Sequence, residues 1–163
     1  MQITFLDLLV AAVVLALVGY VVLGSRGLFG GHGADTLAVL ANAALTPGSL
    51  NPAVTQATIA STICVRGWTK TVRPPQSYTG SLKLRQMRLY GETGSPSDYQ
   101  EDHLISLELG GNPTDPRNLW PEPYPRAADV DRIENDLNRR VCDGSLSLAA
   151  AQATESSLKH REG

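Results

Sequence analysis

The first long hydrophobic stretch lies at the N-terminus, where residues 8–24 read LLVAAVVLALVGYVVLG, without a charged side chain. This length is near the lower limit of what crosses a bilayer, roughly 17–25 residues. A buried core helix would carry a polar stripe, which this segment lacks. A secretory signal peptide would begin with Lys or Arg, and residues 1–7 hold no cation. The pattern therefore predicts an uncleaved single span, with residues 1–26 as a transmembrane anchor or signal-like segment.

Residues 27–50 mix Gly, Ala, Ser and Thr and are interpreted as a linker, which leaves residues 51–163 as the working domain. Asn51 followed by Pro52 is typical of a helix start, so a helix is expected from there to about Cys64. The pieces ICVRGW and TKTVR have a β-like pattern. The segment SLKLRQMRLY alternates imperfectly and is compatible with a short helix that opens at Ser81.

The segment 99–121 has two short apolar pieces, DHLISLEL and NLW, on either side of the turn-rich sequence GGNPTDPR. This pattern is typical of a hairpin with a long loop. The prolines at 121, 123 and 125 are expected to end the pairing, and a helix is expected from about Ala127 to Asp143-Gly144. A last helix is expected within residues 145–160. The order is strand, strand, helix, in an α+β fold with flanking helices behind the N-terminal transmembrane helix.

The formal charge of the 163 residues is −2, which excludes a protein held on nucleic acid by bulk positive charge alone. The charge is nevertheless uneven: residues 36–91 contain no acid, and residues 92–136 contain eleven. The ordinary interpretation of the basic stretch is a solvated face. The alternative is a phosphate-binding surface on which Trp68, Tyr78 and Tyr90 stack against bases. The cations of this stretch are Arg66, Lys70, Arg73, Lys83, Arg85 and Arg88.

The candidate chemistry lies in the hairpin and the helix after it. Asp102 is an oxygen ligand of the kind that Mg²⁺ prefers, and the neighbouring His103 suits a general base because an ordinary imidazole has a pKa near ~6.5. Asn118 could hold the imidazole in one orientation. Glu134 and Asn138 are four residues apart and share a helical face. Each of these residues also has an ordinary structural interpretation, as a surface charge or a turn cap.

Together, EDHLI, ELGG and NLWP resemble the HNH, or ββα-metal, nucleases, and more narrowly a group of small bacterial and phage HNH-like proteins. The resemblance covers about residues 46–153. It implies that His103 is the general base, Asp102 a metal ligand, and Asn118 the residue that fixes the hairpin and orients His103. The helical metal ligand would be Asn138, with Glu134 as second candidate. Two departures are Ser106, where the family usually has Pro, and the long interval from Asn118 to Asn138.

The implied function is metal-assisted hydrolysis of phosphodiester bonds in DNA or RNA. The cofactor would be one divalent ion, Mg²⁺ first, with Mn²⁺, Ca²⁺ or Zn²⁺ as alternatives. The partner would be the phosphate backbone of nucleic acid, read without sequence specificity. The alternative function is an inactive HNH-like module that binds nucleic acid or a protein partner at the membrane. The side chains expected to bind flanking phosphates are Arg66, Lys70, Arg73, Lys83 and Arg85.

The orientation of the predicted anchor has two conflicting signals. Arg26 after the span, with Asp7 before it, places the domain in the cytoplasm by the positive-inside rule. Cys64 and Cys142 point the other way if they pair, since disulfides persist in oxidising compartments, and two buried free thiols are the alternative. The resemblance to HNH nucleases implies that a disulfide between Cys64 and Cys142 would join the end of the first expected helix to the end of the helix that carries the metal ligand. This favours a membrane-anchored domain on the extracytoplasmic side.

Overall fold

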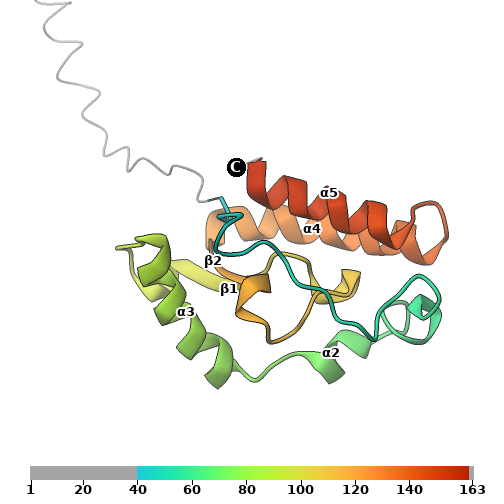
Figure 1. The fold of residues 1–163 in the computed structure, drawn as a ribbon, viewed down its shortest axis with the longest axis horizontal. Coiled ribbons are helices and arrows are strands. Elements are labelled where there is room, and N and C mark those ends of the chain that lie inside the picture. The colour runs from blue at the N-terminus through green and yellow to red at the C-terminus, as the bar shows by residue number, and fades with distance from the viewer. Residues whose placement is uncertain (1–39, 162–163) are drawn as a thin grey trace, which may run out of the picture. The chain divides into compact units, whose positions relative to one another are not determined.

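The computed structural model describes residues 40–161, which fold around a two-stranded sheet flanked by helices (Figure 1). Four α-helices lie within these described residues: α2 (Trp68–Val72), α3 (Gln76–Tyr90), α4 (Tyr124–Cys142) and α5 (Leu148–Arg161). The strands are β1 (Tyr99–His103) and β2 (Leu119–Pro123). Short 3-10 turns at Ile59–Ser61, Pro96–Asp98, Leu107–Leu109 and Pro116–Asn118 connect them. The α+β class is therefore confirmed.

The membrane-spanning helix in the predicted fold class and localisation is wrong for the part of the chain that the structure describes. None of the helices between residues 40 and 161 is long and apolar enough to cross a bilayer. The stretch 8–24, which suggested a transmembrane helix, and Arg26, which suggested its orientation, lie outside the described residues.

The predicted order of strand, strand and helix is confirmed, with different bounds. β1 and β2 are antiparallel, and His103 lies opposite Leu119. β1 ends at His103 instead of continuing through LISLEL, because residues 104–118 form a compact loop with two 3-10 turns. Helix α4 begins at Tyr124, directly after β2, and ends at Cys142 with Gly144 in a left-handed conformation at φ +81°.

The prolines of β2 do not end the pairing, which corrects a second expectation. Pro121 lies opposite Glu101, and Pro123 lies opposite Tyr99. Leu104 donates its N–H to the oxygen of Asn118, so these two residues form a hydrogen-bonded pair. In an antiparallel ladder, hydrogen-bonded and non-hydrogen-bonded pairs alternate from one residue to the next. Both prolines fall at non-bonded positions, where the missing N–H would have pointed away from β1.

The segment expected to be a helix from Asn51 to Cys64 is a series of turns with one 3-10 turn, Ile59–Ser61. Side-chain hydrogen bonds of Thr58 hold this backbone in turns. Its hydroxyl donates to the oxygen of Ala53 (2.8 Å) and accepts the N–H of Thr55 (2.8 Å). Such side-chain bonds compete with the helical ladder. The expected β-like piece TKTVR is instead mostly helix α2, and α3 begins at Gln76, five residues before Ser81.

Residues 41–50, expected to be linker, belong to the folded domain. Ala41 donates its N–H to the oxygen of Lys159, and Gly48 donates to the oxygen of Arg117. Leu50 pairs with Gly111 in an isolated antiparallel bridge. The segment therefore fastens the loop between the strands to the end of α5.

The main core joins α4 and α5 to the loop between the strands. Its buried apolar side chains are Val54, Ile63, Ile105, Leu109, Leu137, Val141, Leu148 and Ala151. The disulfide between Cys64 and Cys142 lies beside this core, with a Cα–Cα distance of 5.5 Å, which confirms the pairing alternative for the two cysteines. A smaller cluster places Trp120 of β2 against Leu104 and Ala41.

The two glycines of the ELGG sequence permit close packing of the loop. Gly110 has φ +80°, and a Cβ there would lie 2.6 Å from Val54. A Cβ on Gly111 would lie 1.7 Å from the backbone oxygen of Ile105 and 2.7 Å from the amide nitrogen of Asn118. A side chain at Gly111 is therefore incompatible with this loop, which explains the glycine pair next to the candidate site.

Candidate functional site

A polar pocket of about 240 Å³ opens at the end of β1. Strand β1, the loop after it and helix α4 supply most of its wall, and Arg73 enters from the residue after α2. Sequence reasoning brought three of its residues forward as catalytic or metal-binding: Asp102, His103 and Glu134. The full lining consists of Arg73, Gln100, Glu101, Asp102, His103, Ser106, Leu107, Asp131 and Glu134.

His103 is held as a neutral imidazole. Its Nε2 lies 3.1 Å from the backbone oxygen of Pro113. A carbonyl oxygen can only accept, so Nε2 carries the proton and Nδ1 keeps its lone pair. Burial lowers the pKa of His103 below its usual value, against the opposing effect of the Asp102 charge. The ring is therefore neutral at pH 7, as a general base requires.

Asn118 fixes the loop that carries the partner of His103. Its side chain is fully buried. Its Oδ1 accepts the N–H of Ile105 (3.0 Å), and its Nδ2 donates to the oxygens of Ile105 (3.0 Å) and Asn112 (3.0 Å). Asn112 immediately precedes Pro113, to which His103 donates. The hairpin-fixing role expected of Asn118 therefore has a geometric basis, and its effect on His103 passes through the backbone.

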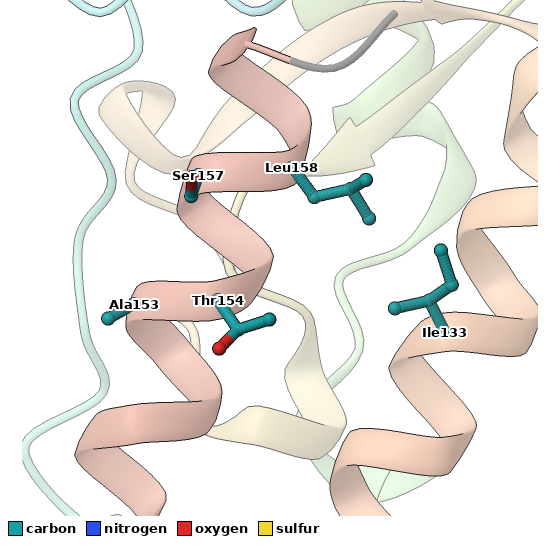
Figure 2. Close-up of a pocket in the computed structure, with 5 residues that line it drawn as sticks. All are labelled: Ile133, Ala153, Thr154, Ser157 and Leu158. Atoms are coloured by element: carbon teal, nitrogen blue, oxygen red, sulfur yellow. The ribbon is translucent and has the colours of Figure 1, made fainter.

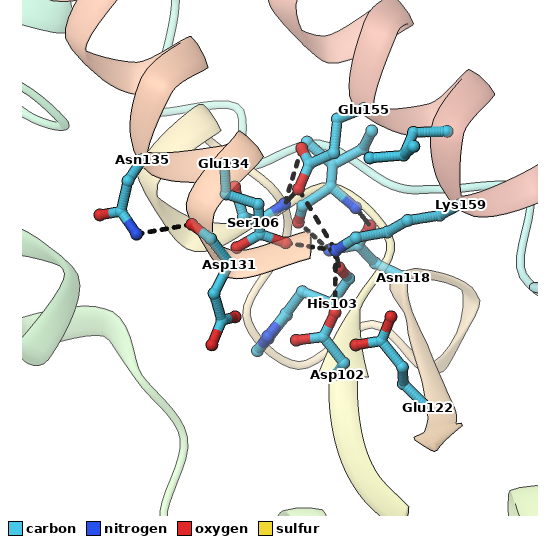
Figure 3. A network of polar contacts seen from close by, with 12 residues as sticks. Asp102, His103, Ser106, Asn118, Glu122, Asp131, Glu134, Asn135, Glu155 and Lys159 are labelled. Atoms are coloured by element: carbon cyan, nitrogen blue, oxygen red, sulfur yellow. Dashed lines mark hydrogen bonds and ion pairs between the residues drawn. The ribbon is translucent and has the colours of Figure 1, made fainter. Parts of the chain in front are cut away.

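A buried ammonium group joins the acidic side chains of the site (Figure 3). Lys159 of α5 is completely buried, and its Nζ lies 2.8 Å from Oδ2 of Asp102 and 2.5 Å from Oε1 of Glu134. The same Nζ donates to the backbone oxygen of His103 at 2.5 Å. Glu155, one turn earlier on α5, contributes an oxygen at 3.3 Å. Asp102 therefore reaches Lys159, while the ring of the adjacent His103 reaches the loop.

The charges of this network are set by burial and by Lys159. Burial alone would lower the pKa of Lys159, but the carboxylates of Asp102, Glu155 and Glu134 outweigh it and raise the pKa well above its usual value. Burial would raise the pKa of Asp102, but the charge and hydrogen bond of Lys159 hold it below its usual range. Burial raises the pKa of Glu155 well above its usual value. The stable state pairs an ammonium with an ionised Asp102.

Further acidic groups at the sheet are neutral at pH 7. Burial raises the pKa of Glu101 to about 8, and burial raises that of Glu122 to about 8. Both oxygens of Glu101 and the hydroxyl of Ser106 are buried and lack a hydrogen-bond partner within the described structure. Glu101 and Ser106 also line the pocket. Buried polar atoms without partners are uncommon in native proteins, so the pocket has unused capacity for a polar ligand.

The predicted metal ligands do not assemble. Asn138 lines a different pocket, and its amide nitrogen donates to the backbone oxygens of Glu108 (2.7 Å) and Ile63 (3.4 Å). Asp102 and Glu134 are close to one another, but both are paired with Lys159. Within residues 40–161 no group of three or more His, Cys, Asp or Glu side chains is arranged to hold a metal ion. The residues present do not fit the expected divalent ion.

The expected phosphate-binding cations are distributed over two helices and the segments beside them. Arg73 lines the polar pocket, and Arg66 lines the neighbouring pocket that contains Asn138. Lys70 is exposed on α2, and Arg85 is exposed on α3. Lys83 is already engaged, since its Nζ donates to the oxygens of Pro96 (2.6 Å) and Tyr99 (2.8 Å). Arg73 is thus the member of this set placed beside His103.

Sequence reasoning missed Lys159 and Glu155. The buried positions of α5 are Leu148, Ala151, Glu155 and Lys159, which follow helical spacing. An apolar stripe that continues into an acid and a base four residues apart is a signal for a buried ion pair.

A larger apolar hollow of about 470 Å³ lies between α4 and α5 and is lined by Ile133, Ala153, Thr154, Ser157 and Leu158 (Figure 2). Its lining holds no titratable side chain, in contrast to that of the smaller polar pocket. Comparisons with protein-family models, with curated proteins and with solved structures find no match to this chain.

Proposed function

We propose that this chain is a phosphodiester hydrolase acting on nucleic acid, with His103 as the general base. The observation that carries the proposal is the state of this imidazole: buried, neutral and fixed through Nε2 to Pro113, at the wall of a polar pocket. A water oxygen would attack phosphorus while Nδ1 of His103 takes its proton. The bond from phosphorus to the leaving oxygen would break, and that oxygen would take a proton from solvent.

The charge of the pocket is compatible with a phosphate, despite its acids. Of the acids that line the pocket, Glu101 is protonated at pH 7 and Asp102 and Glu134 are paired with Lys159, which leaves Asp131 as the lining acid without such compensation. Arg73 supplies a positive charge at the rim, and Lys70 extends the basic surface along α2. Contacts of this kind hold a phosphate backbone without reading sequence. Of the predicted donors of a divalent ion, Asn138 lies in another pocket, and Asp102 and Glu134 are engaged by Lys159, so the proposed mechanism has no step through an ion.

The first test is cleavage of plasmid DNA and of single-stranded RNA by the full chain with its disulfide intact. His103→Ala is expected to lower the rate by about 10²–10⁴-fold, the usual contribution of general-base catalysis. His160→Ala is the matched control, because His160 is held by Ser156 and Thr46 instead of lining the pocket. Equal rates for wild type and His103→Ala would overturn the proposal.

The dependence of kcat/KM on pH is expected to have two limbs. His103 must be neutral, and its lowered pKa places the acidic limb below the ordinary imidazole value of about 6.5. Above pH 8, ionisation of Glu101, whose pKa is about 8, adds negative charge to the pocket and weakens phosphate binding. Glu101→Gln should therefore remove the alkaline limb and leave the acidic limb in place. An acidic limb above the ordinary imidazole value would contradict the assignment of His103.

A second candidate function is a noncatalytic HNH-like module that binds nucleic acid. The observation that favours it is Lys159, whose ammonium is paired with the carboxylates of Asp102 and Glu134, the two acids expected to hold the metal ion. The two functions separate in one experiment. Retardation of DNA in a gel by the folded full chain, without cleavage under any ionic condition, would support the module.

A further inference from the structure

The ammonium of Lys159 lies where the two acidic residues expected to hold a metal ion converge (Figure 3). Asp102 comes from β1, Glu134 from α4 and Lys159 from α5. An ammonium has three N–H donors. The three nearest acceptors of Nζ are the oxygen of His103 (2.5 Å), Oε1 of Glu134 (2.5 Å) and Oδ2 of Asp102 (2.8 Å). Every proton of the ammonium therefore has a partner.

The surroundings of Nζ resemble the oxygen shell of a hard cation. With Oε1 of Glu155 at 3.3 Å, four oxygens from three elements face one point. Ca²⁺ binds such oxygens at roughly 2.3–2.6 Å and Mg²⁺ at roughly 2.0–2.1 Å. The side chain of Lys159 is completely buried, so solvent does not compete for this position. A divalent ion could reach these oxygens only if the ammonium left.

We propose that Lys159 is the resident cation of this site and that its ammonium takes the place of a divalent metal ion. The wild-type site then binds no divalent ion, and Asp102 and Glu134 serve to hold Lys159 and, through it, the end of β1. The inference concerns the same site as the proposed function, but it is tested without measuring activity.

The wild-type test uses Mn²⁺ as the probe, titrated into the full chain and followed by the electron paramagnetic resonance signal of free Mn²⁺. The expected result is no saturable binding that depends on Asp102, so wild type and Asp102→Asn give the same curve. One saturable Mn²⁺ site per chain in the wild type, lost in Asp102→Asn, would overturn the inference. This measurement requires no change at Lys159 and therefore does not depend on whether its variants fold.

The complementary test removes the ammonium. Lys159→Ala leaves a hole surrounded by carboxylate oxygens, so we expect a lower Tm than wild type without ions and a rise in Tm on addition of Mn²⁺ or Ca²⁺. Lys70→Ala is the matched control, because Lys70 is exposed on α2 and its loss should leave Tm insensitive to both ions. If Lys159→Ala does not fold alone, refolding with and without Ca²⁺ replaces the Tm measurement. A folded Lys159→Ala with a wild-type Tm that ignores both ions would overturn the inference.

The results separate this inference from the proposed function. If both hold, plasmid DNA is cut equally in EDTA and in Mg²⁺. If Mn²⁺ does not bind and no nucleic acid is cut, the cation assignment stands and the hydrolase proposal fails. If Mn²⁺ binds at Asp102 and cutting depends on it, the hydrolase proposal stands and the cation assignment fails.

Discussion

Replacing Asn118 by alanine is expected to lower the free energy of unfolding by about 3–5 kcal/mol. The substitution leaves three backbone groups in the buried loop without partners, namely the N–H and oxygen of Ile105 and the oxygen of Asn112. Each buried backbone group left without a partner costs about 1–3 kcal/mol. The side chain of Asn118 is fully buried, so water does not replace the lost hydrogen bonds in the folded loop. Urea denaturation of the full chain measures the change.

The matched control is Asn135→Ala on α4, where the asparagine is exposed and donates to the backbone oxygen of Asp131 within its own helix. That change should cost less than about 0.5 kcal/mol, as surface substitutions usually do. Asn118→Ala should also reduce cleavage in its folded fraction, because the loop that fixes His103 through Pro113 loses its anchor. A loss of stability no larger than that of Asn135→Ala would show that the loop is held by other contacts.

Removing the disulfide is expected to cost about 4 kcal/mol. Cys64 and Cys142 are 78 residues apart, so the bridge closes a long loop and restricts the unfolded chain. In the chain-entropy model a closure of this length contributes about 4 kcal/mol. The bridge also joins the turns after Ile59 to the C-terminal end of α4, beside the main core.

The experiment compares the double variant Cys64→Ser, Cys142→Ser with wild type under oxidising and under reducing conditions. The variant should match reduced wild type and unfold at a lower urea concentration than oxidised wild type. Identical midpoints for all three samples would show that the bridge contributes nothing to stability. A variant less stable than reduced wild type would assign part of the effect to burial of the hydroxyls.

The hairpin and its helix could be predicted from sequence because their signals are local. The glycine pair, the polar turn and the run from Asn118 to Trp120 lie within one segment of the chain. The glycines allow close packing of the loop, Asn118 bonds to it, and Trp120 packs in the smaller core cluster. The pattern therefore predicts Asp102, His103 and Asn118 as neighbours, and they lie at one end of the sheet, where Leu104 donates its N–H to the oxygen of Asn118.

The helical residues of the site could not be resolved from spacing alone. Glu134 and Asn138 share a face of α4, as predicted, but they are separated by about 6 Å along its axis. Glu134 therefore reaches Lys159, while Asn138 reaches the oxygen of Glu108 in the next pocket. Which of two such residues meets a strand end depends on where the helix begins, and α4 begins at Tyr124, not near Ala127.

The spacing of α5 indicates that Glu155 and Lys159 are buried, but it does not identify their partners. Charged side chains on a helix usually face solvent, and burial becomes favourable only when partners from elsewhere in the chain complete the network. Those partners, Asp102 and Glu134, lie 57 and 25 residues away. The threonine-rich segment before Cys64 differs from its predicted helix for a local reason, since Thr58 bonds to Ala53 and Thr55 in place of the helical ladder.

The prolines of β2 also determine how the sheet can associate with other chains. Both strands of a two-stranded sheet are edge strands, and an edge strand normally offers alternating N–H and C=O groups to an incoming strand. At positions 121 and 123 a backbone N–H would point away from β1, but both residues are prolines and have none. Residues 119–122 are moreover buried, so this edge of β2 lacks both the donors and the access that an extended peptide or a second copy would need to add a regular strand.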